Sequence, residues 1–135
     1  MELITDTVYT ATMILKYMND NWRLAKVRFK MIHVKIDRPI GYTDLTHHVP
    51  YPINYGFIPG VIGGDGELQD VYIISNFITQ PISVFEGKVI AIIHREDDVE
   101  EKWVATTPEE MFTKKQIKDR VNFMEQYFNS NIEMI

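Results

Sequence analysis

The stretch YPINYGFIPGVIGGDGELQDVYIIS, residues 51–75, decides what kind of fold this chain can adopt. Its first part is broken by prolines and glycines, which interrupt regular backbone and leave no room for a long helix. Short extended segments joined by turns fit this composition instead. The closing run VYIIS, residues 71–75, is rich in β-branched and aromatic side chains and therefore predicts a strand.

Further strands are predicted on both sides of this stretch. In KVRFKMIHVKI, residues 26–36, apolar and charged side chains alternate and the alternation then changes phase, which predicts a strand with a bulge. Three other runs are rich in strand-forming residues and bounded by turn formers: ISVFEG (82–87), KVIAIIHR (88–95) and KWVATT (102–107).

The first segment of the chain has a different periodicity. Apolar side chains recur at spacings of four and three from Ile4 to Trp22, which predicts an amphipathic helix over residues 4–20. That helix packs either on its own domain or on the same helix of another subunit, and the second arrangement would make the protein a homo-oligomer. Residues 1–25 are predicted to be a helical extension and residues 26–135 a barrel domain.

A second helix is predicted near the C-terminus, over roughly residues 114–129. TPEE, residues 107–110, and the pair Thr113 and Gln116 each have the composition of a capping box. Several strands followed by a helix predict an α+β fold, a small closed or partly open antiparallel β-barrel of OB-like type with an N-terminal and a C-terminal helix. The second helix is expected to be held in place by one apolar face, which consists of Ile117, Val121, Met124 and Phe128.

The composition excludes several classes of function. With 135 residues the chain fits one ordinary domain, and a formal charge of −5 argues against binding to nucleic acid or to an anionic membrane. The absence of cysteine excludes disulfides and thiolate zinc sites. Neither a basic, apolar leader nor an apolar run of roughly 18 residues is found, so we expect a soluble cytoplasmic protein.

Two acidic segments are the candidate functional features. GGDGELQD, residues 63–70, holds three carboxylates, and carboxylates a few ångströms apart repel one another by about 1 kcal/mol per pair in water and roughly 4 kcal/mol near a protein surface. HREDDVEEKWVA, residues 94–105, holds five more. Each segment alone is typical of a solvated turn. If the two converge, oxygen-only ligands favour a hard cation such as Mg²⁺, and such a site implies phosphate chemistry.

The run YPINYGFIPG followed by DGELQDVYI resembles the soluble, Mg²⁺-dependent inorganic pyrophosphatases of barrel type. The hallmark of that family is Tyr-Pro-x-Asn-Tyr-Gly followed by Asp-x-Asp-Pro-x-Asp, and VIAIIHREDDVEEKWVATTP is similar to the family's second acidic loop. The resemblance covers about residues 32–129. It implies hydrolysis of inorganic pyrophosphate to two phosphates with Mg²⁺ as cofactor.

The resemblance also implies a role for each matching residue. Glu67 stands where the family has the aspartate that orients or deprotonates the attacking water. Lys102 and Tyr55 match phosphate contacts, and Tyr51 and Tyr127 match residues that line or close the pocket. The implied metal ligands are Asp65, Asp70, Asp97 and Glu100.

The chain departs from the family where the family has cations. An early hairpin that carries a lysine and a glutamate is shortened or missing, residues 43–48 occupy the place of an arginine, and Phe128 stands where a lysine is expected. Arg38, on the turn DRPIG, is the best replacement because a bidentate arginine grips phosphate well. Lys35 and Arg95 are further candidates, whereas His47 and His48 are interpreted as exposed loop histidines.

Three functions are consistent with these observations. The first is a minimal Mg²⁺-dependent pyrophosphatase. The second is a hydrolase of another phosphoanhydride such as a nucleotide, because the loss of cationic contacts changes which anion fits. The third is a noncatalytic barrel that binds a phosphate-containing ligand or a partner chain.

Overall fold

The computed structural model describes residues 31–96 and 99–135. The predicted helix 4–20, the first part of the predicted strand 26–36, and Asp97 lie outside the described residues. No helix of the described part is long and apolar enough to cross a membrane. The elements in chain order are β1 (Met31–Arg38), β2 (Asn54–Ile62), β3 (Leu68–Ile73), β4 (Val84–Arg95), β5 (Glu101–Thr106), α3 (Lys114–Glu125) and β6 (Ser130–Met134).

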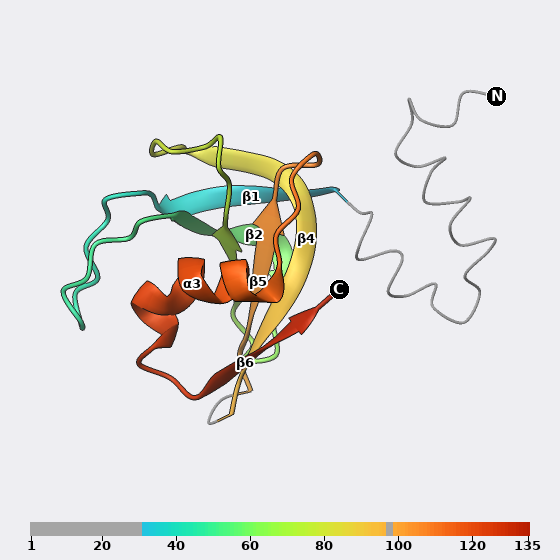
Figure 1. Cartoon of the computed structure of the whole chain (residues 1–135). Helices are drawn as coiled ribbons and strands as arrows, with labels where there is room; N and C mark the ends of the chain where they lie inside the picture. The colour runs from blue at the N-terminus through green and yellow to red at the C-terminus, as the bar shows by residue number, and fades with distance from the viewer. Residues whose placement is uncertain (1–30, 97–98) are drawn as a thin grey trace, which may run out of the picture.

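Five of the strands close into a barrel. The sheet order is β1-β2-β3-β5-β4-β6, and β1 also pairs with β4, so the sheet meets itself and β6 extends it beyond β4. Figure 1 shows the strands curling around one another, with α3 lying along one side before the chain turns back into β6. The predicted α+β barrel is confirmed, and it is closed.

The pairing of strands differs from the prediction in one place. β3 and β5 run parallel, with Val71 opposite Trp103, so the barrel is mixed and not purely antiparallel. The reason is the order of the strands: β4 lies between them in sequence and pairs antiparallel with β5, but it does not pair with β3. Because β4 comes between β3 and β5 in sequence but not in the sheet, β5 runs in the same direction as β3.

β3 is buried on both of its faces. Val71 and Ile73 belong to a cluster that takes side chains from all five barrel strands, whereas Tyr72 and Ile74 belong to a second cluster that includes Ile117 of α3. A strand covered on both faces reads as a continuous apolar run and does not alternate. This explains the composition of VYII, and it identifies the face under α3 as a second layer of core.

Two predicted strands, 82–87 and 88–95, form one continuous strand, β4. The glycine at their junction, Gly87, lies where a Cβ atom would be 2.3 Å from the Thr106 carbonyl oxygen, so it marks a close approach of two strands and not a turn. The bulge predicted within residues 26–36 lies later than expected. The pairing of β1 with β4 is regular from Met31 to Lys35, and the irregularity occurs opposite β2, between Ile36 and Arg38.

The C-terminal region agrees with the prediction where helix α3 begins and differs from it in three other respects. Helix α3 begins at the predicted capping box, where Thr113 accepts from the Gln116 backbone N–H and the Gln116 side chain accepts from the Thr113 N–H. The earlier segment 107–110 is a turn, and the Glu110 carboxylate instead accepts bonds from Ser75, Asn76 and Thr107. The helix ends at Glu125 and not at residue 129, and the unpredicted strand β6 follows because β4 offers it a free edge.

The capping box provides a test of this helix start. We expect Thr113→Ala to lower the free energy of unfolding by about 1 kcal/mol, because one backbone donor of the first turn loses its acceptor. Thr113→Ser keeps the oxygen and is the matched control, with an expected change of a few tenths of a kcal/mol. Urea denaturation of both variants measures the difference, and equal stabilities would show that the box does not hold the helix.

Candidate active site

A cavity of about 280 Å³ lies on the face of the barrel that α3 covers, beside the C-terminal end of that helix. Its walls come from β1 to β5, from the loop between β1 and β2, and from α3 and the turn after it. The side chains that line it are those of Arg38, Asp44, Thr46, His47, Tyr51, Tyr55, Tyr72, Arg95, Lys102, Met124 and Phe128.

Lys102 on β5 is the centre of the charged groups beside this cavity. Its ammonium donates to the Tyr55 hydroxyl at 2.8 Å, to Asp70 Oδ2 at 2.7 Å, and to Glu100 Oε1. The Lys102 side chain is only 8% exposed, so the two carboxylates offset the loss of its hydration. Asp70 belongs to the first acidic segment and Glu100 to the second, and one buried cation therefore brings the two segments together.

The two acidic loops also touch through their backbones. A Cβ atom at Gly64 would lie 2.7 Å from the Val99 carbonyl oxygen, so only glycine permits this approach. Asp65 and Glu67 are exposed on the same loop, and Asp65 Oδ1 accepts the Glu67 backbone N–H at 2.9 Å, which fixes the turn.

The part of the chain that the structure describes contains no group of three or more acidic or histidine side chains arranged around one point. One of the four predicted ligands, Asp97, lies outside those residues. Asp37 is an acidic group that the sequence reasoning missed. Burial raises the pKa of Asp37, Arg38 opposes that rise, and the charge of the Asp70 carboxylate adds to it. The segment DRPIG contains Asp37, but nothing in the local sequence relates it to Asp70.

Arg38 is held by aromatic rings. One guanidinium nitrogen donates to the Tyr51 hydroxyl at 2.9 Å, and the Arg38 Cζ lies 5.5 to 5.9 Å from the ring centres of Tyr42, Tyr51 and Tyr55. Burial acts to lower the pKa of Arg38, but the Tyr51 hydrogen bond and the neighbouring hydroxyls leave it raised, so the group stays charged. Among the described residues no carboxylate forms an ion pair with Arg38, and the Tyr51 hydroxyl is the one acceptor that its guanidinium has there.

Arg95 is placed differently. Its Nε and Nη2 donate to the two oxygens of Glu125 at 3.1 and 2.6 Å, and its Cζ lies 3.6 Å from the centre of the Phe128 ring. Tyr72 donates to the same carboxylate at 2.6 Å, and burial followed by Glu125 raises the pKa of Tyr72 well above its usual value. This buried network ties the end of α3 to β3 and β4. It also neutralises Arg95, which leaves that guanidinium little freedom to bind a ligand.

Tyrosines make the rigid wall of the cavity. Tyr55 packs edge-to-face against Tyr51 and Tyr72, with ring centres 5.8 and 5.0 Å apart. Burial, followed by the nearby Asp70 carboxylate, raises the pKa of Tyr55 well above its usual value, so its hydroxyl remains protonated. Rings packed in this way fix the direction of the hydroxyl groups that face the cavity.

The remaining predicted residues lie further out. The Lys35 side chain is exposed on β1 and does not line the cavity. Tyr127 follows the end of α3, is partly exposed, and stacks on His47 with ring centres 4.0 Å apart. His47 was interpreted as an exposed loop histidine, but it is half-buried and lines the cavity. The network of Arg95, Glu125 and Tyr72 was also missed, since nothing in the local sequence pairs residues so far apart.

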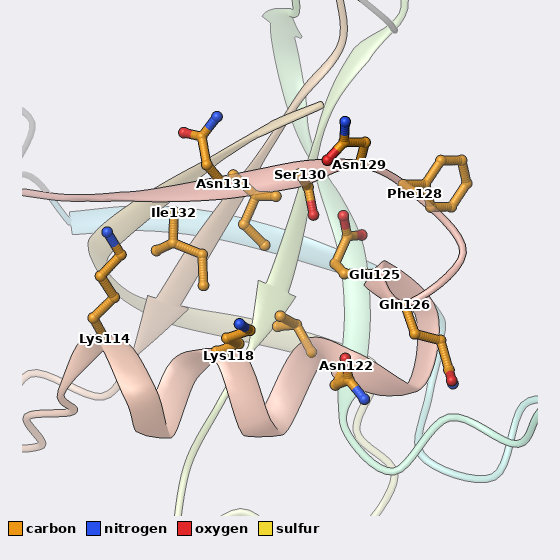
Figure 2. A pocket seen from close by; sticks show the side chains of 12 residues that line it. Lys114, Lys118, Asn122, Glu125, Gln126, Phe128, Asn129, Ser130, Asn131 and Ile132 are labelled. Atoms are coloured by element: carbon orange, nitrogen blue, oxygen red, sulfur yellow. The ribbon is translucent and has the colours of Figure 1, made fainter. Parts of the chain in front are cut away.

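A larger groove of about 400 Å³ lies between α3 and β6 (Figure 2). Lys114 and Lys118 lie along its helix side, and Ser130 and Asn131 come from the strand side. None of the predicted metal or phosphate ligands lines it, so the smaller cavity beside Lys102 is the candidate active site.

Known proteins are similar in sequence to about half of this chain. The inorganic pyrophosphatase of Sulfolobus acidocaldarius is 42% identical over 65 residues, which make up 48% of this chain and 35% of that protein. The inorganic pyrophosphatase of Aeropyrum pernix is 42% identical over 65 residues, or 48% of this chain and 34% of that protein. In these matches the chain spans about a third of the length of its curated relatives.

A solved structure and a family model extend the match to most of the chain. The crystal structure of inorganic pyrophosphatase from Ehrlichia chaffeensis aligns with a TM-score of 0.62 over 78% of this chain and 86% of that chain, at 19% identity. Similarity at that identity establishes the fold alone. The family model described as inorganic pyrophosphatase matches residues 18–133, and the chain therefore belongs to the inorganic pyrophosphatase family.

Proposed function

We propose that this protein hydrolyses inorganic pyrophosphate to two phosphates in a reaction that depends on Mg²⁺. The observation that carries the proposal is the Lys102 ammonium shared by Asp70 and Glu100, which joins the two acidic segments beside a cavity lined by Arg38. In the reaction, a water oxygen bonds to one phosphorus, the bridging P–O bond breaks, and the second phosphate leaves.

The carboxylates beside Lys102 fit a magnesium ion. Pyrophosphatases are metal-dependent as a family, and Mg²⁺ characteristically takes one or two carboxylates together with water and substrate phosphate. Asp70 and Glu100, which meet at Lys102, would supply its two carboxylates, and Asp65 and Asp97, in the same two acidic segments, are the further ligands that the resemblance implies. When bound, the metal neutralises phosphate oxygens and activates the attacking water. Among residues 31–96 and 99–135 no three acidic side chains converge. The site still suits Mg²⁺, because this ion needs only one or two carboxylates from the protein.

Lys102 and Arg38 bind the substrate in this proposal. Pyrophosphate is a compact polyanion, and charge-assisted hydrogen bonds from fixed cations stabilise the additional charge that develops during cleavage. Arg38 presents several N–H groups that have no acceptor in the described protein, on a guanidinium fixed by three tyrosine rings. Tyr55 keeps its proton and stays in contact with Lys102, which holds the ammonium toward the cavity.

Glu67 orients the attacking water in this proposal, although its side chain is one methylene longer than the aspartate of the family pattern. Its backbone N–H donates to Asp65 Oδ1, and its side chain is exposed on the loop that also carries Asp65. A base must come within about 3 Å of its water, and a small misplacement reduces the rate by on the order of 100-fold. We therefore expect slow turnover compared with a chain that carries aspartate at this position.

A second candidate function is hydrolysis of a nucleoside phosphoanhydride. Phe128 and Tyr127 are aromatic and partly exposed, and Phe128 lines the cavity at a position where the family pattern has a lysine. An aromatic ring at that point offers a face for a base to stack on and removes a cation that pyrophosphate would use.

Removal of one metal carboxylate tests the proposal. We expect Asp70→Asn to reduce Mg²⁺-dependent phosphate release from pyrophosphate at least 100-fold, because the variant loses both a metal ligand and a partner of Lys102. Asp119→Asn is the matched control, since Asp119 is exposed on α3, pairs with Lys115 and does not line the cavity. Phosphate release is measured with Mg²⁺ and with chelator. Undiminished turnover in Asp70→Asn would remove the assignment.

Replacement of the arginine tests how the substrate is held. We expect Arg38→Lys to raise the KM for pyrophosphate about tenfold, because lysine keeps the charge but loses the fork of N–H donors. Lys115→Met, a charge change on the exposed face of α3, is the control. The same assay with nucleoside triphosphates separates the two candidate functions. Turnover of nucleotides without turnover of pyrophosphate would favour the second.

A further inference from the structure

The loop between β1 and β2 contains an oriented histidine. Asp44 Oδ2 lies 3.1 Å from His47 Nδ1, and it also accepts the backbone N–H groups of Thr46 at 3.1 Å and His47 at 2.5 Å. The backbone N–H of His47 is the main reason why the pKa of Asp44 is lowered, so this side chain is an anion. One carboxylate therefore fixes both the backbone turn and the direction of the imidazole ring.

The His47 ring is fixed from a second side. It stacks on Tyr127 with ring centres 4.0 Å apart and an angle of 17° between the ring planes. The two residues are far apart in sequence, and their contact brings the loop against the turn that follows α3. His47 is 28% exposed and lines the same cavity as Arg38 and Lys102.

The hydrogen-bonding pattern leaves one ring nitrogen available. A carboxylate accepts hydrogen bonds and does not donate them, so the Asp44 contact keeps the proton on His47 Nδ1. Among the described residues, Nε2 of this histidine has no hydrogen-bond partner. An imidazole ring with a proton on each nitrogen donates from both, and in that form Nε2 is the His47 nitrogen that can donate to an anion in the cavity.

The cavity needs another donor of this kind if it holds a phosphate polyanion. Lys102 is shared between two carboxylates, and Arg95 is bound to Glu125, which leaves Arg38 as the one lining arginine or lysine that forms no ion pair with a carboxylate among the described residues. The chain also has Phe128 in place of the lysine expected there. His47 stands on the shortened loop at the edge of this cavity.

We propose that His47 binds a phosphate oxygen of the substrate through Nε2, and that Asp44 and Tyr127 are positioning residues that hold its ring in place. The proposal rests on the proposed function in so far as it takes the ligand of this cavity to be a diphosphate. It makes the loop of residues 41–50 a part of the substrate site, and it assigns to the exposed neighbour His48 no such role.

Nuclear magnetic resonance of the wild-type protein tests the contact directly. The chain has four histidines, whose ring ¹H–¹⁵N signals can be assigned and followed while methylenediphosphonate, a diphosphate analogue that cannot be hydrolysed, is added. We expect the His47 Nε2 signal to shift with saturation and the His48 signal to stay in place. If the analogue binds and the His47 signal does not move, the proposal is wrong.

Calorimetric titration with the same analogue measures the size of the effect. We expect His47→Gln to weaken binding about tenfold or more, which is the value of a hydrogen bond to a charged group, and His48→Gln to stay within twofold of the wild type. Asp44→Asn keeps an oxygen for the loop N–H groups but loses the charge, and we expect it to fall between them. Equal affinities for the wild type and His47→Gln would overturn the proposal.

The outcome for His47 can be separated from that for the enzyme. A saturable His47 shift in a protein without pyrophosphatase activity would support the histidine contact and reject the proposed reaction. Pyrophosphate hydrolysis with an unmoved His47 signal and an unchanged KM in His47→Gln would support the reaction and reject the histidine contact.

Discussion

The ion pairs of Lys102 are the interaction on which the rest of the site depends. A lysine ammonium that is largely removed from water is stable only if charged partners replace its hydration, and here the partners come from β3 and from the segment just before β5. This requirement brings two acidic loops to one place, although each alone would be repelled by the other. The parallel pairing of β3 and β5 supplies the geometry, because adjacent parallel strands put their corresponding ends at the same edge.

Local patterns predicted most of the elements, because short-range physics determines them. The capping box at Thr113 depends on neighbouring residues and agrees with the structure. The strand predicted from VYIIS is also present, but as β3 it begins at Leu68 and ends at Ile73. The prediction of local structure failed where a segment distant in sequence determines the conformation. β6 is a strand because β4 accepts it, Gly87 is a close contact and not a turn, and Glu110 turns away from a helix start because Ser75 and Asn76 bind its carboxylate.

The candidate site shows the same division. The acidic residues and Lys102 were recognisable because they lie in compact runs that resemble a known family. Arg38 was recognisable from its turn. The pairing of Arg95 with Glu125, the position of Asp37, and the contact of His47 with Tyr127 join segments that no local periodicity relates. The sequence therefore indicates which acidic and basic residues a site contains. It does not indicate which other residues neutralise or orient those side chains.

The arrangement of β3 has a consequence for how the molecule assembles. Its parallel neighbour β5 begins about thirty residues later in the chain, and its other face is covered by α3, which comes later still. Contacts between such distant segments form slowly, because the loop between them must first be closed. During synthesis the apolar run of β3 therefore lacks these partners until β5 and α3 have emerged, so the core layer between β3 and α3 forms late in folding.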